Sequence, residues 1–168
     1  MANRLFAETH QVVSGFVPVV SGSATDGDWV SFKNYNRCTV IYYGAVGTGG
    51  DDPTLTFVQA LTVAGGSPKA LAVVDTIHIK ANADLETIGV NTLVTQTAAA
   101  TYSDATHAEL QKIYQIDVTA EQLDVAGGFD CMRVTVADVG TTDQLTAMLY
   151  IMSEPRYGES ILLSAIVD

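Results

Sequence analysis

Apolar and polar residues alternate most clearly in residues 112–157, where the pattern predicts three β-strands joined by two short connections. The apolar positions are Ile113, Ile116 and Val118 on the first strand, Phe129, Met132, Val134 and Val136 on the second, and Leu145, Ala147, Leu149 and Ile151 on the third. Such alternation is typical of a sheet with one buried face. Residues 119–123 predict a single helical turn, and Gly127-Gly128 can reverse the chain. We therefore predict a three-stranded meander.

The rest of the chain predicts further short strands. Residues 29–35 and 38–46 predict a hairpin with a polar turn at 34–37, followed by a flexible hairpin loop at 47–53. Strands are expected over 54–63 and 70–80 and, more weakly, over 85–94. Residues 95–107 predict an exposed loop or edge strand, with a short helix as the alternative.

The two ends differ from the middle of the chain. Residues 1–27 are expected to form an N-terminal arm and edge strand, because Pro18 lacks the N–H that a central strand must donate. Residues 28–158 are expected to form a β-sandwich domain. Residues 159–168 are expected to form a C-terminal tail or a last strand.

These elements predict an all-β fold. Turn signals recur at the spacing of about 8–12 residues that is typical of all-β domains. The sequence has 20 Val and 19 Thr, residue types that favour strands. The expected architecture is a two-sheet β-sandwich of the jelly-roll type with Greek-key connections, and an up-and-down barrel is the alternative.

Charge narrows the choice of partners. The formal net charge is −11, and the eight basic residues are spread along the chain rather than clustered. Affinity for nucleic acid depends on neutralising phosphates, so we expect no nucleic-acid partner and, for the same reason, no anionic membrane surface. The longest apolar run, residues 147–152, is far shorter than the ~18 residues of a membrane span. With no signal peptide evident, we expect a soluble protein that is not exported by that route.

The sequence has no pattern of residues that is typical of an active site. His10, His78 and His107 have no metal-ligand spacing, and alternation places His78 on the solvent side of its strand. The glycines of residues 44–50 precede Asp51, Asp52 and a strand instead of the helix that a dinucleotide site requires. We therefore expect no enzymatic activity, cofactor, metal or small-molecule substrate.

Three other groups have ordinary structural interpretations. Asp26 with Asp28, and Asp51 with Asp52, lack the alternating spacing of a Ca²⁺ loop. The seven tyrosines lie mostly in strands, where packing accounts for them better than sugar stacking. The two cysteines, Cys38 and Cys131, are expected to be buried and reduced, although a bridge between them stays open.

Apolar segments at both ends indicate contacts, because contiguous apolar surface is rarely left in water. The residues expected to contact a partner or another copy of the chain are Arg4, Phe6, Phe16, Val17, Tyr157, Ile161, Leu162, Leu163 and Ile166.

Residues 29–157 resemble the head decoration, or cement, proteins of tailed bacteriophages. The resemblance rests on WVSFKNYNRCTVIYYGAV, on TAEQLDVAGGFDCMRVTVADV and on MLYIMSEPRY near the end. It implies a jelly-roll sandwich that assembles as a homotrimer on the outer capsid surface of the virion after synthesis in the host cytoplasm. The implied partner is the major capsid protein, and no catalytic residues are implied.

Two alternatives remain at this point. The chain could be another virion part, such as a tail or head–tail connector protein. It could also be a carbohydrate-binding β-sandwich, for which tyrosines gathered on one exposed face would be the sign.

Overall fold

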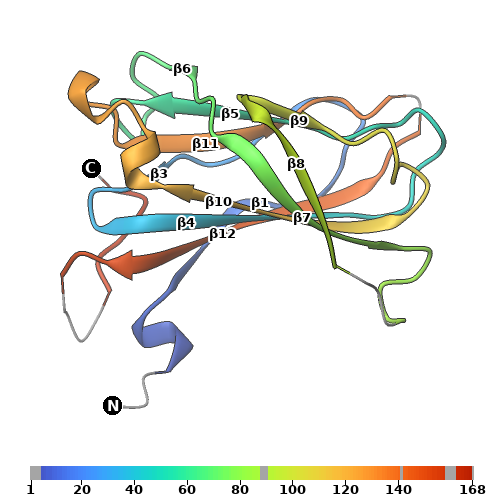
Figure 1. Cartoon of the computed structure of the whole chain (residues 1–168), viewed down its shortest axis with the longest axis horizontal. Helices are drawn as coiled ribbons and strands as arrows, with labels where there is room; N and C mark the ends of the chain where they lie inside the picture. The colour runs from blue at the N-terminus through green and yellow to red at the C-terminus, as the bar shows by residue number, and fades with distance from the viewer. Residues whose placement is uncertain (1–4, 88–90, 141, 158–161, 168) are drawn as a thin grey trace.

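The computed structural model describes residues 5–87, 91–140, 142–157 and 162–167, and these form two antiparallel sheets packed face to face (Figure 1). Sheet A has the order β1-β12-β4-β10-β7-β8, and sheet B has the order β2-β11-β5-β6, with β3 added to β11 and β9 added to β5. The all-β prediction is confirmed.

The strand bounds are β1 (Gln11–Val20), β2 (Thr25–Asp26), β3 (Val30–Ser31), β4 (Tyr35–Gly44), β5 (Thr54–Ala60), β6 (Lys69–Ala70), β7 (Val74–Asn82), β8 (Asn91–Ala99), β9 (Thr101–Ser103), β10 (Gln111–Thr119), β11 (Cys131–Val136) and β12 (Leu145–Pro155). The described helices are short 3₁₀ turns: η1 (Phe6–Glu8), η2 (Ala120–Gln122) and η3 (Val125–Gly127). Within the described residues, no helix has the length and apolar character needed to cross a membrane. The predicted turn at 119–123 is confirmed as η2, and Gly128 then reverses the chain at φ 81°.

Eight strand positions form a jelly roll. In sheet A, β1-β12-β4-β10 lie side by side, facing β2 and β3, β11, β5 and β9 in sheet B. Successive strands of this set change sheets at every connection except the one from β5 to β9. The segment between β5 and β9 is an insertion that contains β6, β7 and β8. Strands β7 and β8 extend sheet A beyond the jelly roll (Figure 1).

Two predicted local pairings are wrong. Residues 29–46 do not form a hairpin, because β3 pairs with β11 in sheet B, whereas β4 lies in sheet A. Residues 112–157 form the three predicted strands but not a meander, because β11 lies in sheet B, while β10 and β12 flank β4 in sheet A. Alternation indicates which face of a strand is buried, but it carries no information about the neighbouring strand.

Two predicted turns also differ from the structure. Tyr35 begins β4, so most of the polar turn expected at 34–37 is strand. The loop at 47–53 crosses between the sheets instead of closing a hairpin, and it buries Asp51 and Pro53. It is therefore part of the folded body and not a flexible surface loop.

Large aromatic residues fill the core between the sheets. Tyr35, Tyr42, Tyr114 and Tyr150 have no exposed surface. The rings of Tyr42 and Tyr114 stack with centroids 5.5 Å apart, and Tyr102 meets Tyr114 edge-on at 5.6 Å. Such pairs stabilise the fold beyond the effect of their buried area, by about 0.5–1.5 kcal/mol each.

Residues 162–167 are tied to the sandwich by hydrogen bonds. In residues 162–167 no strand forms. Instead, the Ser31 N–H donates to the Ala165 carbonyl at 2.7 Å, and the Ala165 N–H donates to the Gln11 side chain at 2.8 Å. Ala165 is fully buried in consequence. The tail therefore contacts its own chain over these residues.

Cys38 and Cys131 are both buried, and no disulfide joins them. They lie on β4 and β11, in opposite sheets. Burial raises the pKa of the Cys38 thiol, and the nearby charge of Asp117 raises it further. Cys38 is therefore an unreactive core residue.

Gly27 lies so close to Val134 and Tyr150 that a larger residue at this position should destabilise the fold. The Gly27 N–H donates to the Val134 carbonyl at 2.9 Å, and a Cβ at Gly27 would lie 2.6 Å from that same oxygen and against the Tyr150 hydroxyl. Because the carbonyl belongs to the backbone of β11, it cannot move freely. We expect Gly27→Ala to lower the free energy of unfolding by about 1–3 kcal/mol, measured by urea titration.

The matched control for this prediction is Gly49→Ala. The closest atom to a Cβ at Gly49 is 3.8 Å away, so this substitution should leave the urea midpoint close to that of the parent protein. Equal stability of the two variants would contradict the close approach at Gly27.

Candidate interaction surface

The outward side of sheet A carries a group of neighbouring apolar side chains. Its side chains point away from the core, because their neighbours along each strand, such as Tyr42 and Tyr150, are buried. We use the term outer face for the side chains of Val12, Ile41, Tyr43, Ile113, Ala147, Leu149 and Ile151. The register places them next to one another: Leu149 lies opposite Ile41, and Tyr43 lies opposite both Ala147 and Ile113.

Strand β12 is therefore apolar on both faces. The pattern predicts that Leu145, Ala147, Leu149 and Ile151 share the buried face, and this is wrong, because the residues that fill the core are Thr146, Met148, Tyr150 and Met152. Leu145 and Leu149 are instead 51% and 42% exposed. Strands that are apolar on both sides are typical of sheets covered on both sides. The outer face thus has the character of a surface that another layer covers.

The N-terminal arm borders this face. The Phe6 and His10 rings stack with centroids 4.3 Å apart. These two rings line a shallow hollow beside the outer face, together with Ile41, His78 and Ile151 and with the polar residues Thr39, Gln115, Asp117 and Ser153. Phe6 is 54% exposed, so the arm adds apolar area to the outer face without covering it. His78 lies on the solvent side of β7, as predicted.

The residues expected to make contacts lie in different surroundings. Phe16 and Leu162 are partly buried and pack against the core of their own chain. The exposed members are Phe6, Val17, Tyr157, Leu163 and Ile166. Arg4 and Ile161 lie outside the described residues. The structure does not gather this set into one surface: Phe6 borders the outer face, whereas Leu163 and Ile166 belong to the tail.

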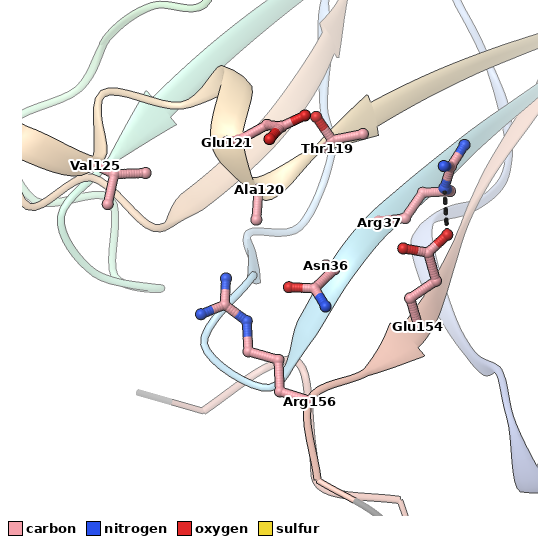
Figure 2. Close-up of a pocket in the computed structure, with 8 residues that line it drawn as sticks. All are labelled: Asn36, Arg37, Thr119, Ala120, Glu121, Val125, Glu154 and Arg156. Atoms are coloured by element: carbon pink, nitrogen blue, oxygen red, sulfur yellow. Dashed lines mark hydrogen bonds and ion pairs between the residues drawn. The ribbon is translucent and has the colours of Figure 1, made fainter.

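A second concave region lies at one end of the sandwich, between the start of β4, η2 and the end of β12 (Figure 2). Arg37 and Glu154 form an ion pair across its rim, with Nε and Oε1 3.0 Å apart. Both side chains are substantially exposed, so the pair contributes little to stability. Arg156 and Glu121 lie on other sides of the hollow.

This hollow continues into a neighbouring one, and the two share Ala120, Val125 and Arg156. The second is lined also by Phe129 and Tyr157, so the combined surface mixes apolar and charged groups. Among the described residues, Arg156 has no acidic side chain within 4.0 Å. Its side chain is exposed.

Asp104, in contrast to the exposed charges of these hollows, is almost fully buried. Its carboxylate accepts hydrogen bonds from the Tyr114 hydroxyl at 2.8 Å and from the Thr106 N–H at 2.9 Å, and it lies 2.7 Å from Nδ1 of His107. Burial alone would raise the pKa of Asp104, but the hydrogen bonds from Thr106, His107 and Tyr114 outweigh it and hold the pKa below its ordinary value.

Lys112 completes this buried polar cluster. Its ammonium donates to the carbonyls of His107 and Ala108 at 3.2 and 3.0 Å, and the residue has no exposed surface. Burial lowers the pKa of Lys112, and the charges of Asp104, Asp52 and Asp51 oppose that shift. The cluster ties the start of β10 to the loops around it. It was not predicted, although Lys112 shares the alternation of Tyr114 and Ile116 and so falls on the buried face.

Other expected features of the site can now be placed. Five of the seven tyrosines are buried, and only Tyr43 and Tyr157 present substantial ring surface to a ligand. These two lie in different regions, on the outer face and beside Phe129. No group of three metal-ligating side chains comes together in the part of the chain that the structure describes.

Comparison with other proteins adds little to this picture. The sequence matches no family model and no curated protein. The chain is similar to the crystal structure of SPBc2 prophage-derived protein YomS, with 12% identity and a TM-score of 0.43 over 84% of this chain and 92% of that chain. It is also similar to the crystal structure of the infectious bursal disease virus VP2 subviral particle, with 9% identity and a TM-score of 0.17 over 94% of this chain and 42% of that chain. Both likenesses are too distant to carry an argument, so the architecture rests on the strand order of this chain.

The Asp104 cluster gives a prediction about pH. Because the folded-state pKa of Asp104 is lowered, its charged form contributes stability above its unfolded pKa of about 4, and that contribution is lost as pH falls through the folded value. We expect Asp104→Asn to lower the free energy of unfolding at pH 7 by about 1–3 kcal/mol. The difference from the parent protein should close below about pH 4.

Urea titrations from pH 7 down to pH 2.5 would measure this difference. Asp75→Asn on β7 is the matched control, because Asp75 is exposed to solvent. A gap between the parent protein and Asp104→Asn that persists unchanged at pH 2.5 would show that the carboxylate charge is not the source of the effect.

Proposed function

We propose that this protein is a structural component of a bacteriophage virion. In this proposal it binds the outside of the icosahedral capsid as a homotrimer and stabilises contacts between subunits of the major capsid protein. It acts without catalysis, cofactor or small-molecule substrate. It is made in the host cytoplasm and resides on the outer capsid surface.

The observation that carries the proposal is the apolar outer face of sheet A. A jelly roll needs only one buried face on each sheet, yet β12 is apolar on both over residues 145–151, and β4 adds Ile41 and Tyr43 to its outward side. Leu149, at 42% exposed, and Tyr43, at 41%, lie at the centre of that face. An exposed apolar surface of this kind marks a contact with another macromolecule. It is more consistent with a binding component than with a protein that acts alone.

Two further features support a role on a virion. The resemblance of residues 29–157 to capsid cement proteins implies this architecture, and the jelly roll is found among virus structural proteins. That second point is an analogy of fold and does not by itself establish function. The net charge of −11 favours a protein partner over nucleic acid.

The trimer follows from the resemblance and has a physical advantage. A closed ring of three copies can bind several capsid subunits at once. After the first contact forms, the remaining contacts form at a raised effective concentration. Modest individual contacts then suffice for stable attachment. The exposed ring of Phe6 beside the outer face is suited to extend each contact.

The proposal predicts that the purified protein is a trimer that binds undecorated capsids of its own phage and raises their rupture temperature. Leu149→Glu should weaken capsid binding at least tenfold, because it places a charge in the centre of the apolar face. Co-sedimentation with capsids would measure binding, and calorimetry of the particles would measure the rupture temperature.

The matched control is Leu61→Glu. Leu61 has nearly the same exposure, at 39%, but it follows β5 in sheet B and lies away from the outer face. It should bind capsids like the parent protein. A stable monomer that fails to bind capsids at any concentration would overturn the proposal, and six-fold rings would favour a tail or connector component instead.

A further inference from the structure

Strand β8 (Asn91–Ala99) forms one free edge of sheet A. Among the described residues, it is the last strand in the order of the sheet and pairs only with β7. Its regular part is residues 91–95, which lie opposite residues 76–80 of β7. Leu93, at the middle of that part, is 56% exposed. An edge strand presents a row of unpaired N–H and C=O groups to any second strand of suitable character.

The other edge of sheet A, β1, is protected against such pairing. It contains Pro18, and its register shifts twice against β12. The Asp28 N–H donates to the Gly15 carbonyl at 2.8 Å, which occupies that oxygen. Proline, irregular register and covering loops are the devices by which natural sheets block edge pairing.

Within the part of the chain that the structure describes, residues 91–95 of β8 have none of these devices. The irregularity on this strand is confined to residues 96–98, which lie opposite the single residue Asp75. Residues 91–95 contain no proline and no charged side chain. Strands β7 and β8 also belong to the insertion, so the jelly roll can close without them. Their exposed edge therefore calls for an explanation outside the core fold.

Charge identifies the kind of partner. Residues 87–103 include no charged side chain, although the chain has 19 acidic and 8 basic residues. Two copies with a net charge of −11 each repel one another, so contact is least opposed where neither copy contributes a charge. The uncharged edge is thus suited to a second copy of this same chain.

We propose that β8 pairs antiparallel with β8 of a second copy, about a two-fold axis that passes beside Leu93. Leu93 then lies opposite Leu93 of the second copy, and Asn91 lies opposite Thr95. Directly opposed residues on antiparallel strands have Cβ atoms about 4.5–5.5 Å apart. Pairing satisfies the free backbone groups and removes the exposed Leu93 side chain from water. An isologous contact of this kind is the commonest type in homo-oligomers.

The geometry has one consequence for the outer face. A two-fold axis between antiparallel edge strands runs perpendicular to the sheet, so both copies present the same side of sheet A in the same direction. The pair displays two outer faces on one side. The pairing does not rest on the proposed function: if the protein is also a trimer, the two-fold contact joins two trimers, and if it is not, the contact joins two single chains.

Sedimentation equilibrium over a wide concentration range tests the pairing, with Leu93→Lys compared with the parent protein. At high concentration the parent should have twice the mass of the variant, because opposed lysines on the axis repel. Val17→Lys is the matched control, since Val17 is 69% exposed on the protected edge β1. It should keep the mass of the parent. Equal masses for the parent and Leu93→Lys would overturn the pairing.

A covalent trap tests the register without depending on affinity. Under mild oxidation Leu93→Cys should yield disulfide-linked dimers, whereas Val17→Cys should not, and the native Cys38 and Cys131 are buried. Equal cross-linking of the two variants would indicate random collision and would contradict the axis. If the parent protein forms dimers that depend on Leu93 but never forms trimers, the proposed function alone is contradicted.

Discussion

The structure depends on a constraint that no local segment can meet: the central strand of sheet A, β4, pairs with two strands that come much later in the chain. Residues 37–44 pair with β10 on one side and with β12 on the other. Without both neighbours, sheet A does not form around β4, and inward side chains such as Tyr42 have no core to pack into. The jelly-roll connections follow, because the chain crosses to the opposite sheet at every connection of the jelly roll except the one from β5 to β9 and so leaves these places open.

The sequence predicts the parts of this fold that depend on local pattern. Alternation correctly placed Met132, Val134 and Val136 in the core and His78 outside it. It failed wherever both faces of a strand are apolar. In residues 145–152 either alternating set could have been the buried one, and the tyrosine and methionines fill the core instead of the leucines.

Strand partners and buried charges were beyond such reasoning for a different reason. The hairpin expected over residues 29–46 is locally plausible, but β3 pairs instead with β11, a strand far away in the sequence. The Asp104 cluster joins residues whose hydrogen bonds exist only after folding, so only the position of Lys112 in the alternation could have signalled it. The outer face had a visible signal in the unbroken apolar run of residues 147–152.

The two surfaces singled out by the structure have complementary roles in the proposals. The outer face of sheet A offers area for a large partner, and the edge of β8 offers backbone groups to a second copy. Both belong to sheet A, and the insertion that carries β8 extends that same sheet. Under the proposed pairing, the insertion lengthens one sheet and joins two copies without altering the outer face that each presents.

The burial of Lys112 has a practical consequence. The chain contains four lysines, and Lys33 and Lys69 are exposed while Lys112 has no accessible surface. An acylating reagent needs an accessible, unprotonated amine, so Lys112 reacts only in molecules whose loops have opened at that end of the sandwich. The exposed lysines provide an internal reference for the reagent in the same sample. The rate of Lys112 labelling therefore reports local opening of the native protein.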